Sequence, residues 1–272
     1  MELRISPWRF GRYDLPIEQA NREMGFVMAT NLAHNGTTVR GALAKRPWPV
    51  IVGGIAARNI QTDDELSALH HTGATVAFGR NETIFNEGDT AKYAYKLVSG
   101  AVRLCKLLPD GRRQIADFYL DGDLFGFLDL DDHAFSAEAI TNVTVVRYVR
   151  SQVRSIEEED GALRRTLTKM LHQRLSRAQS HLVMLGRQTV KERIASFLIQ
   201  MVERLDADTL GKACVDLPMG RQDIADYLGL TIETVCRALS DLKRAGIIAV
   251  PNTHQIVIND IETLHTIVDG DI

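Results

Sequence analysis

The chain has 272 residues but only three cysteines, and these lie far apart at Cys105, Cys214 and Cys236. No two of them have the spacing of a metal site, so we predict neither a cysteine-bound metal nor a disulfide framework. Free thiols fit a reducing compartment. Long apolar runs are absent too, and none approaches the roughly 20 residues of a membrane-spanning helix. Residues 1–10 lack the apolar core of a secretion signal. We expect a cytoplasmic protein without a membrane segment.

An excess of positive charge is also missing. The net charge is −3, and acidic residues outnumber basic ones from Arg187 onward. This balance excludes a general nucleic-acid coating protein, but it allows a specific binder with a few positive groups on one face. Signs of catalysis are missing as well. We find no nucleophile paired with a base and no phosphate-binding loop, and the acidic run Asp129–Asp132 lacks the spacing of a calcium loop. We therefore predict a protein that is not an enzyme and holds no metal or cofactor.

Patterning divides the chain into four regions. Residues 1–60 are weakly patterned, and we expect an extension that is disordered or loosely docked, in which Trp48–Val52 could add a strand. Residues 61–152 hold short β-branched and aromatic runs, separated by glycines every eleven or twelve residues. Such spacing predicts a small sandwich, barrel or jelly roll. The runs are Thr75–Phe78, Tyr95–Ser99, Ala101–Leu107, Gln114–Tyr119, Phe135–Ala139 and Val143–Val149.

Residues 153–187 have helical periodicity. Apolar residues recur there at spacings of four and three, as on the contact seam of a coiled coil. The seam consists of Leu171, Leu175, Ala178, Leu182 and Leu185. A single helix packed on the β domain would also explain the pattern, but a seam this narrow favours a partner helix. We predict a symmetric dimer through a helix about 40 Å long, which follows the acidic run Glu157–Asp160.

Residues 188–272 have the pattern of a winged helix-turn-helix. Lys191–Leu205 is an amphipathic helix. Two short helices follow within Arg221–Arg244, where Gly229 can take the positive φ that ends the first and Thr231 can cap the second. Apolar residues at helical spacing give each of the two a buried stripe. A β-hairpin is then expected from Ile247–Val250 and Gln255–Ile258.

The second of these helices carries the candidate base-reading residues. Its apolar stripe leaves Ile232, Glu233, Cys236 and Arg237 facing outward near the N-terminal end. That end of a recognition helix reaches the base edges in the major groove. An arginine there can bind guanine, and a glutamate can accept a hydrogen bond from cytosine. A core hairpin with a surface ion pair is the alternative interpretation of the same pattern.

Several segments together resemble the CRP/FNR superfamily of bacterial transcription regulators over residues 65–265. They are Phe85–Asp89, Tyr95–Leu104, Gly122–Gly126 and Gln222–Arg237. The phrase DIADYLGL and the pattern Glu-Thr-Val-X-Arg are most similar to the FNR and FixK branch. The resemblance implies an α+β chain with an N-terminal β-roll of the sensor type, a long dimerisation helix and a C-terminal winged helix-turn-helix.

The resemblance also implies partners and site residues. We expect a homodimer that binds double-stranded DNA, reads a TTG-type palindrome with Glu233 and Arg237, and activates transcription by RNA polymerase. The positions expected to touch phosphates are Arg221, Gln222, Thr231 and Thr234. Cys236 departs from the serine that FNR-like members usually have. Because a thiolate is favoured near a helix N-terminus, Cys236 is also a candidate redox-sensitive group. The alternative is an unreactive small residue that fits the groove.

The resemblance further predicts which effectors are missing. Members that bind cyclic AMP carry a glutamate for the ribose and an arginine for the phosphate, but this chain has Phe127 and Phe135 there. Three cysteines cannot supply the four thiolates of an iron–sulfur cluster. We therefore expect FixK-like DNA binding without a bound effector. The alternatives are a haem-dependent gas sensor and a module that binds protein through its winged helix. The candidate haem ligands are His70, His71, His133, His172 and His181.

Overall fold

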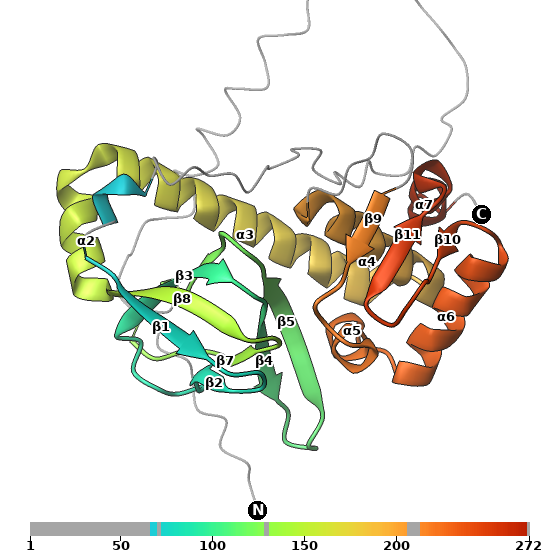
Figure 1. The fold of residues 1–272 in the computed structure, drawn as a ribbon, viewed down its shortest axis with the longest axis horizontal. Helices are drawn as coiled ribbons and strands as arrows, with labels where there is room; N and C mark the ends of the chain where they lie inside the picture. Colours follow the sequence, from blue (N-terminus) through green and yellow to red (C-terminus); the bar gives the residue numbers. More distant parts are fainter. Residues whose placement is uncertain (1–65, 70–71, 128–130, 206–212, 271–272) are drawn as a thin grey trace, which may run out of the picture. The chain divides into compact units, whose positions relative to one another are not determined.

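The computed structural model describes residues 66–69, 72–127, 131–205 and 213–270 (Figure 1). The predicted extension over residues 1–60 and its strand at Trp48–Val52 lie outside these ranges. Within the described part of the chain, no helix combines the length and the apolar character needed to cross a lipid bilayer.

The first half of the described chain forms two four-stranded antiparallel sheets, preceded by a 3-10 turn at Ser67–Leu69. One sheet has the order β1 (Ala74–Phe78), β8 (Val143–Val149), β3 (Tyr93–Ser99) and β6 (Leu124–Phe125). The other has the order β2 (Thr83–Phe85), β7 (Ser136–Ala139), β4 (Val102–Leu107) and β5 (Arg113–Tyr119). Side chains from both sheets share one buried cluster, which includes Phe85, Leu97, Val102, Phe125 and Val145. The expected β-roll is therefore present, and all six predicted runs are strands.

Turns between these strands depend on glycine. Gly100 joins β3 to β4 with a φ of +103°, and a Cβ atom there would lie 2.4 Å from the backbone oxygen of Asn142. The β4–β5 hairpin turns at Gly111, where the backbone N–H donates to Leu108 O at 2.9 Å. Both positions fit the turns predicted from the regular glycine spacing.

Two helices follow the β-roll, α2 (Arg150–Glu159) and α3 (Gly161–Arg187). The break falls at Asp160, whose carboxylate accepts from the N–H groups of Ala162 and Leu163 at 2.8 and 3.2 Å. This side-chain cap starts α3 immediately after the acidic run. The 27 residues of α3 give a length of about 40 Å, which agrees with the prediction.

The last part of the chain is the winged helix domain. It contains α4 (Val190–Arg204), β9 (Ala213–Asp216), α5 (Arg221–Leu228), α6 (Ile232–Arg244), β10 (Ile248–Ala249), β11 (Gln255–Ile258) and α7 (Ile261–Val268). The predicted hairpin is confirmed as β10 and β11, and β9 extends it to a three-stranded sheet in the order β10-β11-β9. Thr189 and Glu192 form a capping box at the start of α4.

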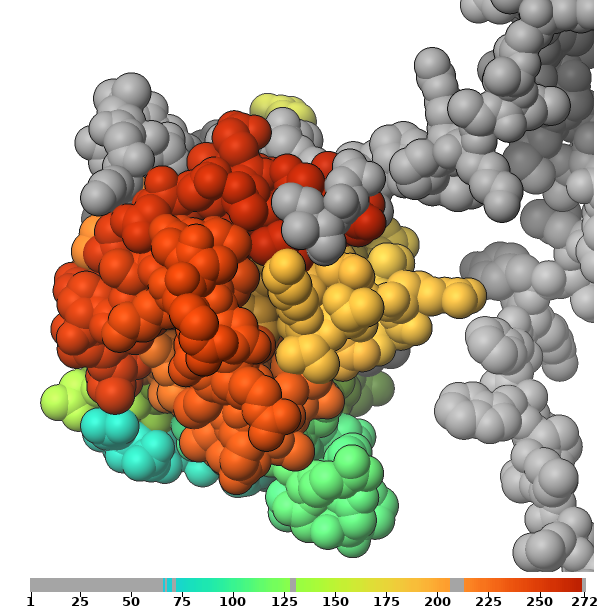
Figure 2. Space-filling view, turned by 90° about the vertical axis from the view of Figure 1, so that its right-hand side faces the viewer, coloured from blue at the N-terminus to red at the C-terminus, as the bar shows by residue number. Residues whose placement is uncertain are grey.

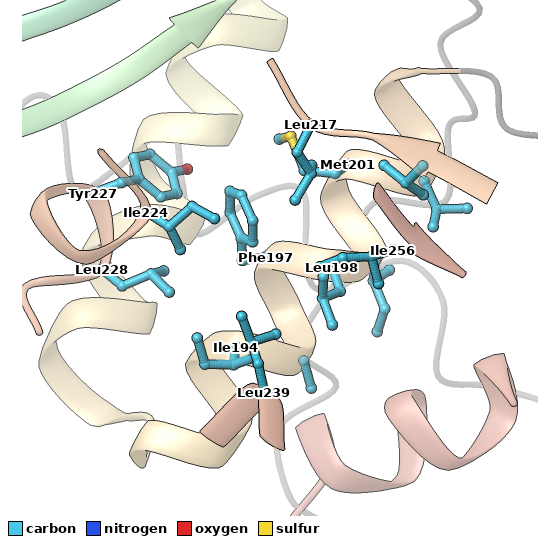
Figure 3. Packing of buried hydrophobic residues seen from close by; sticks show 14 of the residues in the cluster. Ile194, Phe197, Leu198, Met201, Leu217, Ile224, Tyr227, Leu228, Leu239 and Ile256 are labelled. Atoms are coloured by element: carbon cyan, nitrogen blue, oxygen red, sulfur yellow. The ribbon is translucent and has the colours of Figure 1, made fainter. Parts of the chain in front are cut away.

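One apolar core holds this domain together. Ile194, Phe197, Leu198 and Met201 project from α4 toward side chains of α5, α6 and the sheet (Figure 3). The same cluster continues into the β-roll through residues of β4 and β5, including Ile115 and Phe118. The two domains therefore share a continuous apolar contact.

Candidate nucleic-acid interface

The helix-turn-helix follows the predicted local rules. Gly229 ends α5 in the left-handed conformation at φ +62°, and Leu230 N–H donates to Ala225 O at 3.0 Å. Thr231 caps α6, because its hydroxyl oxygen accepts from Thr234 N–H at 3.3 Å. The apolar stripe of α6 is buried, as expected, at Val235, Leu239 and Leu242.

The other side of α6 is open. Glu233, Cys236 and Arg237 are exposed, and Ile232 is half-buried. Figure 2 looks onto the winged helix domain, whose orange and red surface faces the viewer. The structure therefore brings the four predicted base-reading residues to the first turns of one helix.

The two charged groups on this face are ready to make new hydrogen bonds. Glu233 accepts from its own backbone N–H and from the Thr231 hydroxyl, and these bonds lower the pKa of its carboxyl group. It is therefore an ionised acceptor at neutral pH. Within the described residues, the Arg237 guanidinium has no hydrogen-bond partner and no ion pair. The pair can thus offer one acceptor and one forked donor to base edges.

The first turn of α5 carries donors that are still unused. Its N-cap, Gly220, provides no side-chain hydrogen bond to the helix. Arg221 is half-buried, and its Nη1 has no partner among the described residues. Burial lowers the pKa of Arg221, and the neighbouring Cys236 opposes this effect. Gln222 and Thr231 are exposed, and Thr234 is half-buried. A helix N-terminus with free donors is suited to an anion.

Arg193 on α4 connects this site to the long helix, and no pattern in the sequence singles it out. Its guanidinium donates to Leu228 O at the end of α5 at 2.9 Å and to Leu185 O on α3 at 3.0 Å. Its Nε donates to Gln188 O at 3.0 Å. Leu185 also lies against the turn at Gly229. One arginine therefore joins α3, α4 and the helix-turn-helix.

The predicted seam on α3 is largely exposed on the single chain. Leu171, Leu175 and Leu182 are 44, 53 and 70% exposed. Ala178 is exposed as well, whereas Leu185 is half-buried. His181 and Met184, on another side of the helix, are buried. A row of large apolar side chains in water fits a partner helix better than a helix packed only on its own domain.

Aromatic rings fill the interior of the β-roll. Tyr95 and Tyr119 stack on Phe125 with centroid distances of 5.2 and 4.9 Å. Arg174 of α3 lies over the rings of Tyr119 and Phe127 at 4.5 and 5.3 Å and donates to Leu124 O. The interior of the β-roll is thus lined by aromatic rings, with an arginine of α3 beside them.

Of the candidate haem ligands that the structure describes, two are buried against other side chains and one is exposed on α3. His133 is buried and stacks on Phe85 at 3.6 Å. His181 is buried on Tyr227, with its Nε2 atom 2.9 Å from Tyr227 O. His172 is exposed on α3, and His70 and His71 lie outside the described residues. In the described ranges, no three His, Cys, Asp or Glu side chains gather as metal ligands.

Comparisons with known proteins agree with this arrangement. A cyclic nucleotide-binding domain model matches residues 75–160, and a Crp-like helix-turn-helix domain model matches residues 192–267. The nitrogen fixation regulation protein FixK of Bradyrhizobium diazoefficiens is 45% identical over 186 residues, which are 68% of this chain and 78% of that protein. The chain belongs to the CRP/FNR family. Within that family, FixK of Azorhizobium caulinodans is 40% identical over 214 residues, or 78% of this chain and 86% of that protein.

The likeness within the CRP/FNR family extends to three dimensions and to the FixK-like branch. The solved structure of FixK2 from Bradyrhizobium japonicum matches 72% of this chain and 96% of its own length, with a TM-score of 0.67 and 40% identity. The predicted family, branch and fold class are therefore confirmed. The chain is a DNA-binding transcription regulator, and its relatives are named as regulators rather than as enzymes.

Proposed function

We propose that the protein is a homodimeric transcription activator that reads a TTG-type palindrome without a cyclic nucleotide or an iron–sulfur cluster. In this proposal residues 61–152 form the sensor-type β-roll, 153–187 the dimerisation helix and 188–272 the DNA-binding domain. The partners are double-stranded DNA and RNA polymerase, which sets the place of action in the cytoplasm. The protein acts by binding and has no catalytic residues.

One observation carries the proposal. Glu233 and Arg237 lie one turn apart on the exposed face of a capped helix, and among the described residues neither has an ion-pair partner. In this position an arginine fork fits guanine O6 and N7, and a carboxylate fits cytosine N4. A TTG·CAA half-site offers both groups. Ile232 and Cys236 flank the pair and would contact the neighbouring bases.

Phosphate contacts would fix the register of this helix. We assign them to Arg221, Gln222, Thr231 and Thr234, which lie at the starts of α5 and α6. The unpartnered Nη1 of Arg221 and the uncapped first turn of α5 support this assignment. Such contacts strengthen binding to every sequence, whereas Glu233 and Arg237 set the preference among sequences.

Two further observations support the dimer and the absence of an effector. The exposed seam of α3 would be buried by a second copy, which would set two recognition helices about one DNA turn, roughly 34 Å, apart. The ring-filled interior of the β-roll, with Arg174 over Tyr119 and Phe127, supports a regulator that needs no nucleotide to complete its fold.

Binding to labelled duplexes with single-base changes in a TTG palindrome tests the proposal. Arg237→Ala should weaken binding by about 1–3 kcal/mol on the matched site and flatten the preference at one base pair. Glu233→Ala should flatten the preference at the same pair, because the cytosine N4 that it would bind belongs to the single G·C pair of the TTG·CAA half-site. Lys243→Ala, at the other end of α6, is the matched control and should leave the ranking of duplexes unchanged. If both test variants weaken binding equally on every duplex, these residues do not read bases.

A further inference from the structure

An arginine of the β-roll reaches across to the first helix of the helix-turn-helix. Arg113 is the first residue of β5, and its Nε donates to Asp226 Oδ2 on α5 at 2.8 Å. Its Nη2 lies 2.7 Å from the same oxygen and 2.6 Å from Asp223 Oδ1. One guanidinium therefore binds two carboxylates of α5 with forked, charge-assisted hydrogen bonds.

A second arginine of the β-roll completes the cluster. Arg103 on β4 donates to Asp223 Oδ1 at 3.2 Å and to Glu138 Oε2 at 2.8 Å. Arg103 and Asp223 are both buried. The cluster thus contains two positive and three negative groups, and both carboxylates of α5 are paired with arginines of the other domain.

Asp226 connects Arg113 to Gln222, on the side of α5 that we propose faces DNA. Its second carboxylate oxygen, Oδ1, accepts from Gln222 Nε2 at 2.7 Å. Gln222 lies one turn earlier, in the first turn of the helix, and is exposed. Asp226 therefore has one oxygen on the β-roll and the other on a side chain that we assign to a phosphate.

Packing around the relay of Arg113, Asp226 and Gln222 holds β5 and α5 together. The Tyr227 ring lies 5.1 Å from the Phe118 ring of β5. Gln114 Nε2 donates to Tyr227 O at 3.3 Å. In Figure 1, β5 runs along the side of the β-roll nearest α5. The relay thus joins surfaces that are already in apolar contact, so its geometry is defined by the fold.

Without the arginines, this arrangement would oppose DNA binding. Asp223 and Asp226 lie within the helix whose first turn we assign to phosphate contacts. An unpaired carboxylate there would repel the DNA backbone and would draw Gln222 into other orientations. Arg113 cancels the first effect and limits the second.

We propose that Arg113 is a positioning residue for DNA binding, which acts through Asp226 on Gln222 although it belongs to the β-roll. This inference rests on the proposed function, because it assumes that the start of α5 faces phosphates. It assigns to the β4–β5 hairpin an indirect influence on DNA affinity, through Asp226 and Gln222, but none on base preference.

A double-mutant cycle on operator affinity tests the inference. Arg113→Gln should weaken binding to a TTG palindrome and to a base-substituted duplex by the same factor, about tenfold. In an Asp226→Asn background, which removes the unpaired charge and keeps an acceptor for Gln222, the same change should cost threefold or less. Arg113→Lys, which keeps the charge but lacks the fork, should fall between wild type and Arg113→Gln.

Arg112→Gln is the matched control, because Arg112 is exposed on the same hairpin and, in the part of the chain that the structure describes, pairs only with Asp110. It removes the same charge and should change the affinity less than twofold. An equal loss for Arg113→Gln with and without Asp226→Asn would overturn the relay, even where the wild-type protein reads the palindrome normally. Failure of the wild-type protein to prefer the palindrome over the substituted duplex would instead overturn the proposed base reading, and the cycle on either duplex would still test the relay. Wild-type protein that binds no duplex at all would overturn both.

Discussion

At the scale of single residues, Glu233 and Arg237 lie on the face of α6 opposite its buried apolar stripe. The spacing of Val235, Leu239 and Leu242 marked the buried side, so Glu233 and Arg237 had to lie on the other. The same reasoning could not pair Arg113 with Asp226 or Arg103 with Asp223. These partners are more than a hundred residues apart and meet only because the two domains pack together.

The three cysteines now have different surroundings. Burial, reinforced by the charge of Glu138, raises the pKa of the Cys105 thiol to about 11, which leaves it protonated and unreactive at neutral pH. Cys214 and Cys236 are exposed, the latter on the proposed DNA face.

We predict that peroxide reduces DNA binding by oxidising Cys236 to an acid that repels phosphates. Cys236→Ser should retain its binding after treatment, whereas the wild-type protein loses most of it. A gel-shift assay before and after peroxide measures the effect, with Cys214→Ser as the matched control for an exposed thiol. An equal loss of DNA binding in the wild-type and Cys236→Ser proteins would show that oxidation at another site is responsible.

His181 makes stability depend on pH. Burial lowers its pKa below the ordinary value near 6.5, although hydrogen bonds to the Tyr227 and Ala116 carbonyls act in the opposite direction. The unfolded chain therefore takes up this proton first as the pH falls, and the folded state loses stability below about pH 6.5. Above that pH, the imidazole is neutral in both states, so it does not make the free energy of unfolding depend on pH.

We predict that His181→Gln flattens the fall in the free energy of unfolding between pH 7.5 and 5.5. Urea denaturation at several pH values measures it. His172→Gln, on the exposed part of the same helix, should keep the wild-type slope. A His181→Gln protein with the full wild-type slope would assign the pH dependence to other groups.

At the scale of elements, segments with a clear period or with turn signals beside them could be predicted, and several others could not. All six β-roll runs, the long helix and both helices of the helix-turn-helix follow from their patterns. The strands β2 and β6 have three and two residues, too few for an alternation to stand out. The third strand of the wing, β9, and the final helix, α7, were also missed, because their apolar residues matter only once the domain core has formed.

The seam on α3 leads to a prediction about assembly. Leu182→Asp would place a charge in the apolar contact between two copies, so the dimer should dissociate at micromolar concentration. Ser176→Asp adds the same charge at an exposed position outside the seam and should leave the protein dimeric. Sedimentation velocity separates the two outcomes, and operator affinity should fall only for the monomer. A dimeric Leu182→Asp protein would place the contact elsewhere.

At the scale of the whole molecule, the β-roll and the winged helix share a core, so each supports the other. Ile115 and Phe118 of the β-roll belong to the same buried cluster as Phe197 and Tyr227. The family resemblance predicted both domains and their order. It did not predict this shared surface, because contacts between domains depend on the details of both faces.

We predict that cyclic AMP changes neither the melting temperature nor the operator affinity. A ligand that binds only the folded state raises the melting temperature as its concentration exceeds its dissociation constant. Phe127 and Phe135 provide no polar group for a ribose or a phosphate. Differential scanning fluorimetry with up to millimolar nucleotide measures the effect, with a cyclic AMP-binding relative as a positive control. A dose-dependent rise would contradict the effector-free proposal.

Arg193 has a mechanical consequence for such a dimer. Its guanidinium binds the end of α3, the start of α4 and the end of α5 at once. In a dimer formed through α3, the helix-turn-helix would therefore be held firmly relative to the dimer axis. A small change in the angle at which two α3 helices cross would then move both α6 helices, and the displacement would grow with their distance from the dimer axis. The crossing angle of the α3 helices would then set the distance between the two α6 helices. The protein should therefore accept only a narrow range of spacings between the half-sites of its operator.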